Sequence, residues 1–279
     1  YFCLRELRVL ESRGGVYASV DGLRASGIIA NQQTSTALFL VIIVCLILGT
    51  MDAFKDFTWK IFSFVSLCAS CAAVFSTGSR GGMACLALSV VVFCFLNPAK
   101  IGKALAATFI VGMGAWIATP GQVQARLAAI LPETQATVSG LLGDQEAMPE
   151  SGSSSVADRA MTASWFFKEI MPQAGLLGMG AGWKGLGAID NCYLSEWMYH
   201  GVIGLLIFIR LQWFILNFCL KAAKEGKDPG EKGVASGVAT AVVVMCASCI
   251  HGDTFYLIRP MECLALLIGL VAARRGMSR

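Results

Sequence analysis

Long apolar runs separated by short polar links dominate the chain. A helix that crosses a membrane needs about 20 largely apolar residues. Most of the candidate runs, the first and the last included, are somewhat shorter than this. The candidate runs are about 34–50, 59–77, 82–98, 102–119, 197–220, 234–251 and 257–273. The pattern therefore predicts an all-α, polytopic integral membrane protein with about seven transmembrane helices.

The polar segments divide this predicted architecture into three parts. Residues 1–119 would form an outer N-terminal segment and helices one to four, and residues 120–195 a large extracytoplasmic loop. Residues 196–279 would form helices five to seven and a basic cytoplasmic tail. The chain begins at Tyr1 with a charged stretch that does not resemble a signal peptide. We expect the chain to be either the C-terminal part of a longer protein or a shortened one.

Composition supports the membrane interpretation. Hydrophobic residues make up 56% of the chain and charged residues 14%, and the mean hydropathy is +0.67. A soluble domain carries roughly 25% charged residues. These values argue against disorder, a collagen, a small disulfide scaffold and an ordinary soluble enzyme. The net charge of +4 is small, and no nucleic-acid partner is expected.

The distribution of basic residues predicts the orientation, because cytoplasmic loops are enriched in lysine and arginine. With seven helices, the links at 51–58, 97–103 and 221–232 and the C-terminal tail all fall on one side, which is then cytoplasmic. The N-terminal segment and residues 120–195 then face outward. The basic residues on the predicted cytoplasmic side are Lys55, Lys100, Lys103, Lys221, Lys224, Lys227, Lys232, Arg274, Arg275 and Arg279.

Most of the eleven cysteines lie inside apolar runs, where cysteine behaves as a small hydrophobic residue. Two pairs, Cys68 with Cys71 and Cys246 with Cys249, have the spacing of metal or redox motifs. Zinc needs four ligands, and only His251 lies near either pair in the sequence. Packing on a helix face is therefore the favoured interpretation, and we expect no metal and no other cofactor.

Four arginines collect on the predicted outer face: Arg24, Arg80, Arg159 and Arg259. An arginine at a membrane rim is costly unless it snorkels, pairs with an acid or meets an anion. Any one of them could snorkel, or pair with Glu262, Asp253 or Asp158. Several on one face favour a site for phosphate or pyrophosphate, which the guanidinium fork fits.

A second group of candidates follows the glycine-rich turn at residues 175–183. This turn follows no strand, so it does not predict a dinucleotide site. Asp190, Glu196 and His200 could each act as a base, or each could be a helix cap or a rim contact. For Asp190 the competing interpretation is a helix N-cap.

Arg210 lies in the middle of a predicted span. We expect it to face the bundle interior, with Glu262 as a possible partner. A structural pair and a ligand contact are both open.

Together these patches resemble the O-antigen ligase and polymerase family of bacterial membrane glycosyltransferases. Arg24-Ala-Ser-Gly27 with Asn31, and Thr77-Gly-Ser-Arg80-Gly-Gly82, look like two family motifs. Arg159, Trp165 and the glycine turn at 178–182 resemble the family's large periplasmic loop. Asn191, Gly201 and Gly204 keep the spacing of the ligase motif, in which Asp190 stands where ligases have histidine.

The resemblance implies an active site on the periplasmic face of the bacterial inner membrane. Its arginines would bind the pyrophosphate of an undecaprenyl-pyrophosphate-linked glycan, without a metal. A lipid or glycan acceptor would attack through a hydroxyl, assisted by Asp190 first, or by His251 or Glu196. Asn191, Gly201 and Gly204 would position the acceptor or the loop. Ligase and polymerase activity, and transfer to protein hydroxyls, stay open, as does a transporter or flippase without chemistry.

Overall fold

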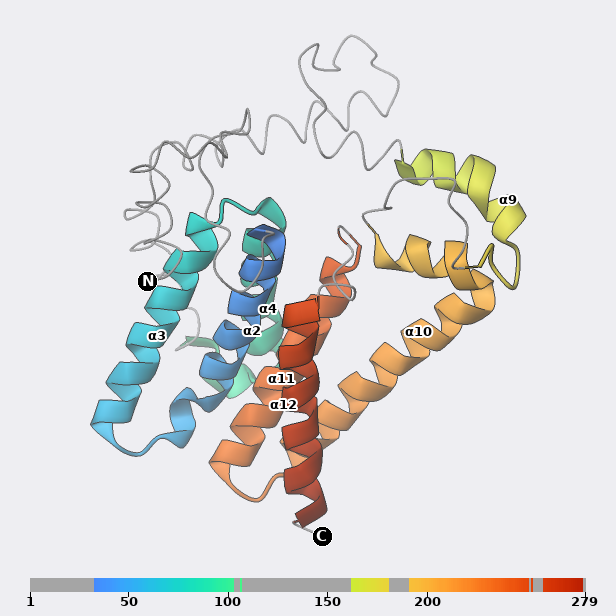
Figure 1. The fold of residues 1–279 in the computed structure, drawn as a ribbon. Coiled ribbons are helices and arrows are strands. Elements are labelled where there is room, and N and C mark those ends of the chain that lie inside the picture. The colour runs from blue at the N-terminus through green and yellow to red at the C-terminus, as the bar shows by residue number, and fades with distance from the viewer. Residues whose placement is uncertain are drawn as a thin grey trace. The chain divides into compact units, whose positions relative to one another are not determined.

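The computed structural model describes residues 33–102, 106, 162–180, 191–250, 252 and 258–277 (Figure 1). These residues are helical, and no strand occurs among them, which confirms the all-α prediction for this part of the chain. The elements are α2 (Gln33–Thr50), η1 (Met51–Ala53), α3 (Phe57–Ser76), α4 (Arg80–Leu96), η2 (Pro98–Lys100), η4 (Phe166–Ile170), α9 (Met171–Ala174), α10 (Cys192–Glu225), α11 (Pro229–Ser248) and α12 (Ile258–Met277).

The predicted membrane segments coincide with helices wherever the chain is described. Only the segment 102–119 lies almost wholly outside the described residues. Four stretches among the described residues are long and apolar enough to cross a membrane: Thr34–Ala53, Phe57–Ser76, Cys192–Glu225 and Pro229–Ser248. The helix Arg80–Leu96 is apolar but shorter. The protein therefore has the helices of a membrane protein.

The chain forms two compact units. Unit 1 comprises Tyr1–Pro120, Leu211–Ser248 and Thr254–Arg279, and unit 2 comprises Gly121–Arg210 and Cys249–Asp253. Helix α10 contributes its first part to unit 2 and its second part to unit 1. We describe each unit separately.

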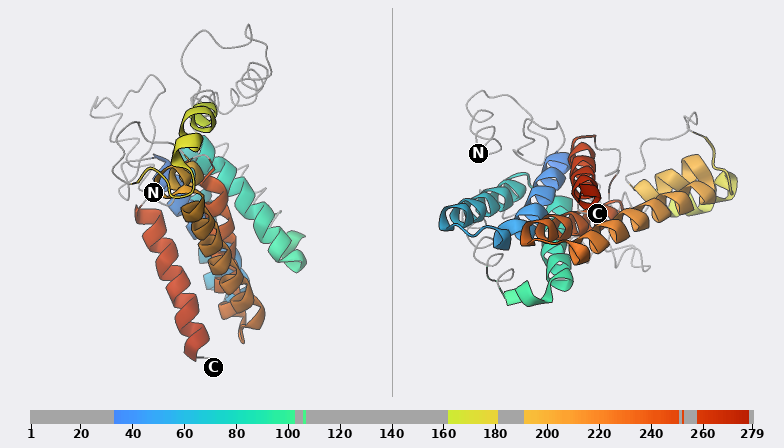
Figure 2. Two further views of the ribbon diagram at one scale, coloured as in Figure 1. Left: turned by 90° about the vertical axis from the view of Figure 1, so that its right-hand side faces the viewer. Right: turned by 90° about the horizontal axis from the view of Figure 1, so that it is seen from below.

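Unit 1 is a helical bundle built around α2. This helix packs against α3, α4, α11 and α12, and lies between α3 and α12 when the bundle is seen from below (Figure 2). Helices α2, α4 and α12 run in one direction, and α3 and α11 run in the other (Figure 1). The side chains of Leu38, Val41 and Ile42 on α2 are almost fully buried, so α2 supplies the centre of the core.

Glycines bring α2 and α11 unusually close together. A Cβ added at Gly233 of α11 would lie 2.5 Å from the backbone oxygen of Gly49 on α2. A Cβ added at Gly237 would lie 2.7 Å from the oxygen of Cys45. Small residues at a helix interface let backbones approach and raise van der Waals contact, which drives helix association in lipid. This crossing therefore depends on the absence of side chains.

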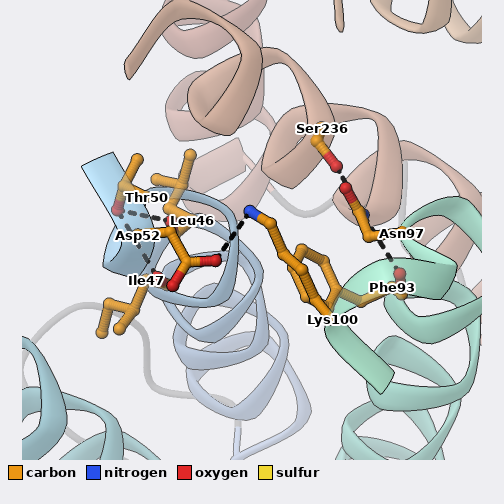
Figure 3. A network of polar contacts seen from close by, with 8 residues as sticks. All are labelled: Leu46, Ile47, Thr50, Asp52, Phe93, Asn97, Lys100 and Ser236. Carbon is orange, nitrogen blue, oxygen red and sulfur yellow. Dashed lines mark hydrogen bonds and ion pairs between the residues drawn. The ribbon is translucent and has the colours of Figure 1, made fainter. Parts of the chain in front are cut away.

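A polar network joins the elements at one end of unit 1, which we call the lysine end (Figure 3). Asn97 Nδ2 donates hydrogen bonds to Ser236 Oγ (2.8 Å) and to the carbonyl of Phe93 (3.1 Å). Lys100 Nζ forms an ion pair with Asp52 Oδ2 at 3.2 Å. The chain that follows α4 is thus tied to η1, which follows α2, and to α11.

The cysteines pack as the sequence predicts. Cys45, Cys71, Cys85, Cys94 and Cys219 are buried in the core of unit 1, and Cys68, Cys246 and Cys263 pack against it. All ten cysteines in the described ranges are free thiols. No cluster of three or more metal-binding side chains occurs among the described residues.

Candidate functional site

The turn between α3 and α4 is built from buried hydroxyl groups. Thr77 Oγ1 donates a hydrogen bond to the carbonyl of Val74 (2.7 Å) and accepts one from the backbone N–H of Ser79 (3.2 Å). Ser79 is the N-cap of α4, and its Oγ accepts a hydrogen bond from the N–H of Gly82 at 3.1 Å. Gly78 allows the turn because it adopts a φ of 61°.

This turn makes Arg80 the first residue of α4, and its side chain is half-buried. Gly82 lets α4 approach α2, because a Cβ there would overlap the Cβ of Ala37. The neighbouring start of α2 carries the buried hydroxyl residues Ser35 and Thr36. We call this end of unit 1, formed by Ser35, Thr36 and residues 76–80, the hydroxyl end.

The other predicted anion-binding arginines are described less fully. Arg24 and Arg159 lie outside the described residues. Arg259 is the second residue of α12, and its backbone alone is described. Helices α4 and α12 run in the same direction (Figure 1), so both begin toward the hydroxyl end. A common cavity for Arg80 and Arg259 stays a prediction.

In unit 2, helix α10 is broken at Gly201, whose backbone has φ 68° and ψ −170°. The break leaves backbone groups without partners inside the helix, and the glycine turn supplies them. The N–H groups of Met179 and Gly180 donate to the carbonyls of Met198 (2.8 Å) and Tyr199 (3.1 Å). In the other direction, Val202 N–H donates to the Gly175 carbonyl and Ile203 N–H to the Leu176 carbonyl, both at 3.3 Å.

Only glycine fits at the points where the turn and the break meet. Gly178 has a φ of 79°, and a Cβ there would lie 2.5 Å from Gly201 N. A Cβ at Gly201 would overlap the carbonyl of Leu176. Both positions therefore need glycine for conformation and for space. Gly201 thus breaks α10 at the place where the glycine turn docks, and its role in positioning the acceptor or the loop stays a prediction.

Aromatic packing holds η4 and α9 against the first part of α10. Phe166, Ile170, Ala174 and Met198 are almost fully buried together. The ring of Trp197 meets that of Phe166 edge-on, with centroids 5.9 Å apart. This cluster fixes the segment before the glycine turn to the helix that carries Glu196 and His200.

Asn191 caps α10 and holds the chain that follows α11. Its Oδ1 accepts a hydrogen bond from Leu194 N–H (3.1 Å), and its Nδ2 donates one to the Ile250 carbonyl (2.7 Å). Cys192 Sγ donates to the Gly252 carbonyl at 3.2 Å. The N-cap role that the sequence offered as the rival for Asp190 thus belongs to Asn191. Asp190 itself lies outside the described residues.

The same contacts involve the chain neighbours of His251, which itself lies outside the described residues. Its two chain neighbours, Ile250 and Gly252, both accept hydrogen bonds from the start of α10. In addition, Cys192 N–H donates to the Cys249 carbonyl at 2.9 Å. Two stretches that are far apart in the sequence and that both carry candidate bases are therefore joined.

Glu196 and His200 form a pair on the first part of α10. Glu196 Oε2 lies 2.8 Å from His200 Nδ1. The side chain of Glu196 is 16% exposed and that of His200 is 55% exposed. The spacing of four residues on a helix predicts such a contact, so the sequence itself carries a signal for this pair.

Gly204 lies one helical turn after His200 and leaves room for it. A Cβ at position 204 would overlap the Cβ of His200 and lie 3.2 Å from its Cγ. The break at Gly201 produces this crowding, because side chains in an unbroken helix do not overlap one turn apart. Gly204 therefore leaves the space that His200 occupies, which the motif spacing alone could not reveal.

The expectation that Arg210 faces a bundle interior is wrong. Arg210 is exposed, and only 11% of the apolar window of α10 is buried. The reason is that α10 packs few of its side chains against other elements, so a mid-span position is not an interior one.

Comparisons with protein-family models, with curated proteins and with solved structures gave no match to this chain.

Proposed function

We propose that this protein is a metal-independent membrane glycosyltransferase of the O-antigen ligase or polymerase type. It moves or polymerises a glycan from an undecaprenyl-pyrophosphate donor onto an acceptor hydroxyl at the outer leaflet of the bacterial inner membrane. The hydroxyl end of unit 1 faces the periplasm in this proposal, and the lysine end faces the cytoplasm.

The observation that carries the proposal is the position of Arg80. It is the first residue of α4, in a turn whose hydroxyl groups are buried. A helix N-terminus bears a partial positive charge and favours anions. A guanidinium there adds a fork that binds two phosphate oxygens at once. At the opposite end of unit 1, Lys100 pairs with Asp52, and Lys232 lies in the first turn of α11.

In the proposed reaction, the acceptor oxygen attacks the anomeric carbon of the donor sugar. The bond between that carbon and the pyrophosphate oxygen breaks, and undecaprenyl pyrophosphate leaves with the bonding electrons. Arginines neutralise its growing charge, and one such preorganised donor is worth about 3–4 kcal/mol in known enzymes. Asp190, His251 and Glu196 are the candidates for removing the acceptor proton.

The experiment compares variants of Arg80 in cells that depend on this protein for their surface glycan. Arg80→Ala should abolish glycan transfer, and Arg80→Lys should impair it, because an ammonium group cannot reproduce the fork. Arg274→Ala is the matched control, since Arg274 is exposed near the C-terminal end of α12. Membrane levels are measured for each variant. Full transfer by Arg80→Ala would remove the main support for the proposal.

The same cells separate a transferase from a transporter. A flippase would leave the glycan on its lipid carrier after movement, whereas a transferase releases the carrier. Accumulation of lipid-linked glycan on the periplasmic face in the Arg80→Ala strain supports transfer. Accumulation on the cytoplasmic face would favour the transporter alternative.

A further inference from the structure

We propose that His200 is the group that removes the proton from the acceptor hydroxyl, and that Glu196 and Gly204 are its positioning residues. The inference rests on the proposed glycosyl transfer and identifies the base of that reaction. In this proposal Glu196 is not itself the base, because the base is His200, the histidine that Glu196 contacts.

The pair has the geometry of an oriented imidazole. Glu196 Oε2 lies 2.8 Å from Nδ1 of His200. A carboxylate can only accept a hydrogen bond, so the proton of the neutral ring resides on Nδ1. The other nitrogen, Nε2, then carries the free lone pair that a base needs.

The exposure of the two side chains indicates which one is the base and which one positions it. The Glu196 side chain is 16% exposed and the His200 side chain 55% exposed. The carboxylate is therefore largely covered, while much of the imidazole is open to an incoming hydroxyl group. A surface ion pair that only stabilised the helix would contribute little and would not need this arrangement.

The backbone around the pair is built to hold the ring in place. Gly204 leaves the space that the Cβ of His200 occupies. Gly201 produces the break that brings the two positions together, and the turn at Gly178 covers that break with four backbone hydrogen bonds. Gly204 is thus required beside His200 itself, and Gly178 and Gly201 are required at the break that begins at the next residue, which a plain amphipathic helix would not require.

The proposed step balances in protons and electrons. As the acceptor oxygen bonds to the anomeric carbon, its proton moves to Nε2 and makes an imidazolium with both nitrogens protonated. The electron pair of the broken glycosidic bond leaves with undecaprenyl pyrophosphate. Water then takes the proton from the imidazolium and restores the neutral ring.

The first test reads the ring directly and does not depend on glycan transfer. The chain has only two histidines, so protein labelled with ¹⁵N-histidine in lipid nanodiscs gives signals from two rings, and His200→Gln identifies those of His200. At a pH where both rings are neutral, we expect His200 to be protonated on Nδ1. In Glu196→Ala it should change to the Nε2–H form that free histidine favours. The Nε2–H form in the unsubstituted protein would overturn the inference.

The second test measures transfer kinetics. His200→Gln should lower kcat about a hundredfold or more, the usual size of general-base assistance. Glu196→Ala should lower kcat while KM for the lipid-linked donor stays near its original value. Gln173→Ala is the control, because Gln173 is exposed and bonds only within its own turn. An unchanged His251 signal shows that each variant is folded.

The third test uses the variant Gly204→Ala. The added methyl group should displace the ring, lower kcat and weaken the Nδ1–H signature together. Gly269→Ala is the matched control, since a Cβ there meets nothing within 4 Å. If the unsubstituted protein transfers glycan and folded His200→Gln keeps full activity, the base assignment is wrong and the proposed function stands. If the unsubstituted protein transfers no glycan, the proposed function itself fails.

Discussion

The proposed chemistry depends on a few side chains whose contacts the structure describes. Asn191 uses both ends of its amide, one to cap α10 and one to hold the Ile250 carbonyl. Glu196 contacts the His200 ring, and Arg80 begins α4 inside a turn of buried hydroxyl groups. Each of these side chains therefore serves the local fold and the proposed reaction at once.

A substitution at Asp190 separates the two candidate bases. Asp190→Asn removes a negative charge and leaves the cap of α10 intact, because Asn191 provides it. If His200 is the base, transfer by Asp190→Asn should fall by about tenfold at most, well short of the loss in His200→Gln. The check is the initial rate of transfer at equal membrane levels. A hundredfold loss in Asp190→Asn with little loss in His200→Gln would give the role of base to Asp190.

Some contacts of single residues can be predicted from the sequence, and others cannot. The spacing of Glu196 and His200 on a helix predicts their contact, and an Asn before an apolar helix predicts a cap. The need for glycine at position 204 cannot be predicted from the sequence. It depends on the broken backbone at Gly201, which brings His200 into the space next to Gly204.

At the scale of helices, apolar runs predicted the elements well because a spanning segment must satisfy its own backbone and present apolar side chains. The ranges 59–77 and 82–98 correspond to α3 and α4 within two residues at each end. Helix α10 begins at Cys192, earlier than the predicted 197, since the cap rather than hydropathy sets its start. The docked glycine turn was missed because its hydrogen bonds join distant backbone segments.

The crossing of α2 and α11 makes a prediction about stability. Gly49→Ala would place a methyl group against the backbone oxygen of Gly233, where no flexible side chain can yield. We expect a loss of about 1–3 kcal/mol, the usual cost of overpacking, seen as a lower melting temperature in detergent. Gly269→Ala should keep or slightly raise that temperature, because alanine is the better helix former and the site is open. Equal melting temperatures for the two variants would contradict the close crossing.

At the level of the whole molecule, the proposed function requires that the lysine end and the segment before α10 lie on opposite sides of the membrane. Lys227 and Gln173 are both exposed, so cysteines placed there can react. Gln173→Cys should react with an impermeant thiol reagent from the periplasm of intact cells, and Lys227→Cys only after the membrane is opened. The unsubstituted protein measures the background from its own cysteines. Labelling of both sites in intact cells would contradict the topology and the proposed active face.

Glycan transfer by the purified protein is the decisive measurement of the proposed function. The protein is placed in lipid nanodiscs with an undecaprenyl-pyrophosphate-linked glycan and a hydroxyl acceptor from the same cells, in the presence of EDTA. We expect undecaprenyl pyrophosphate to be released in step with glycosylated acceptor, chelation to leave the rate unchanged, and Arg80→Ala to abolish both products. If the lipid-linked glycan stays intact, or if Arg80→Ala consumes it equally, the protein is not a transferase of this type.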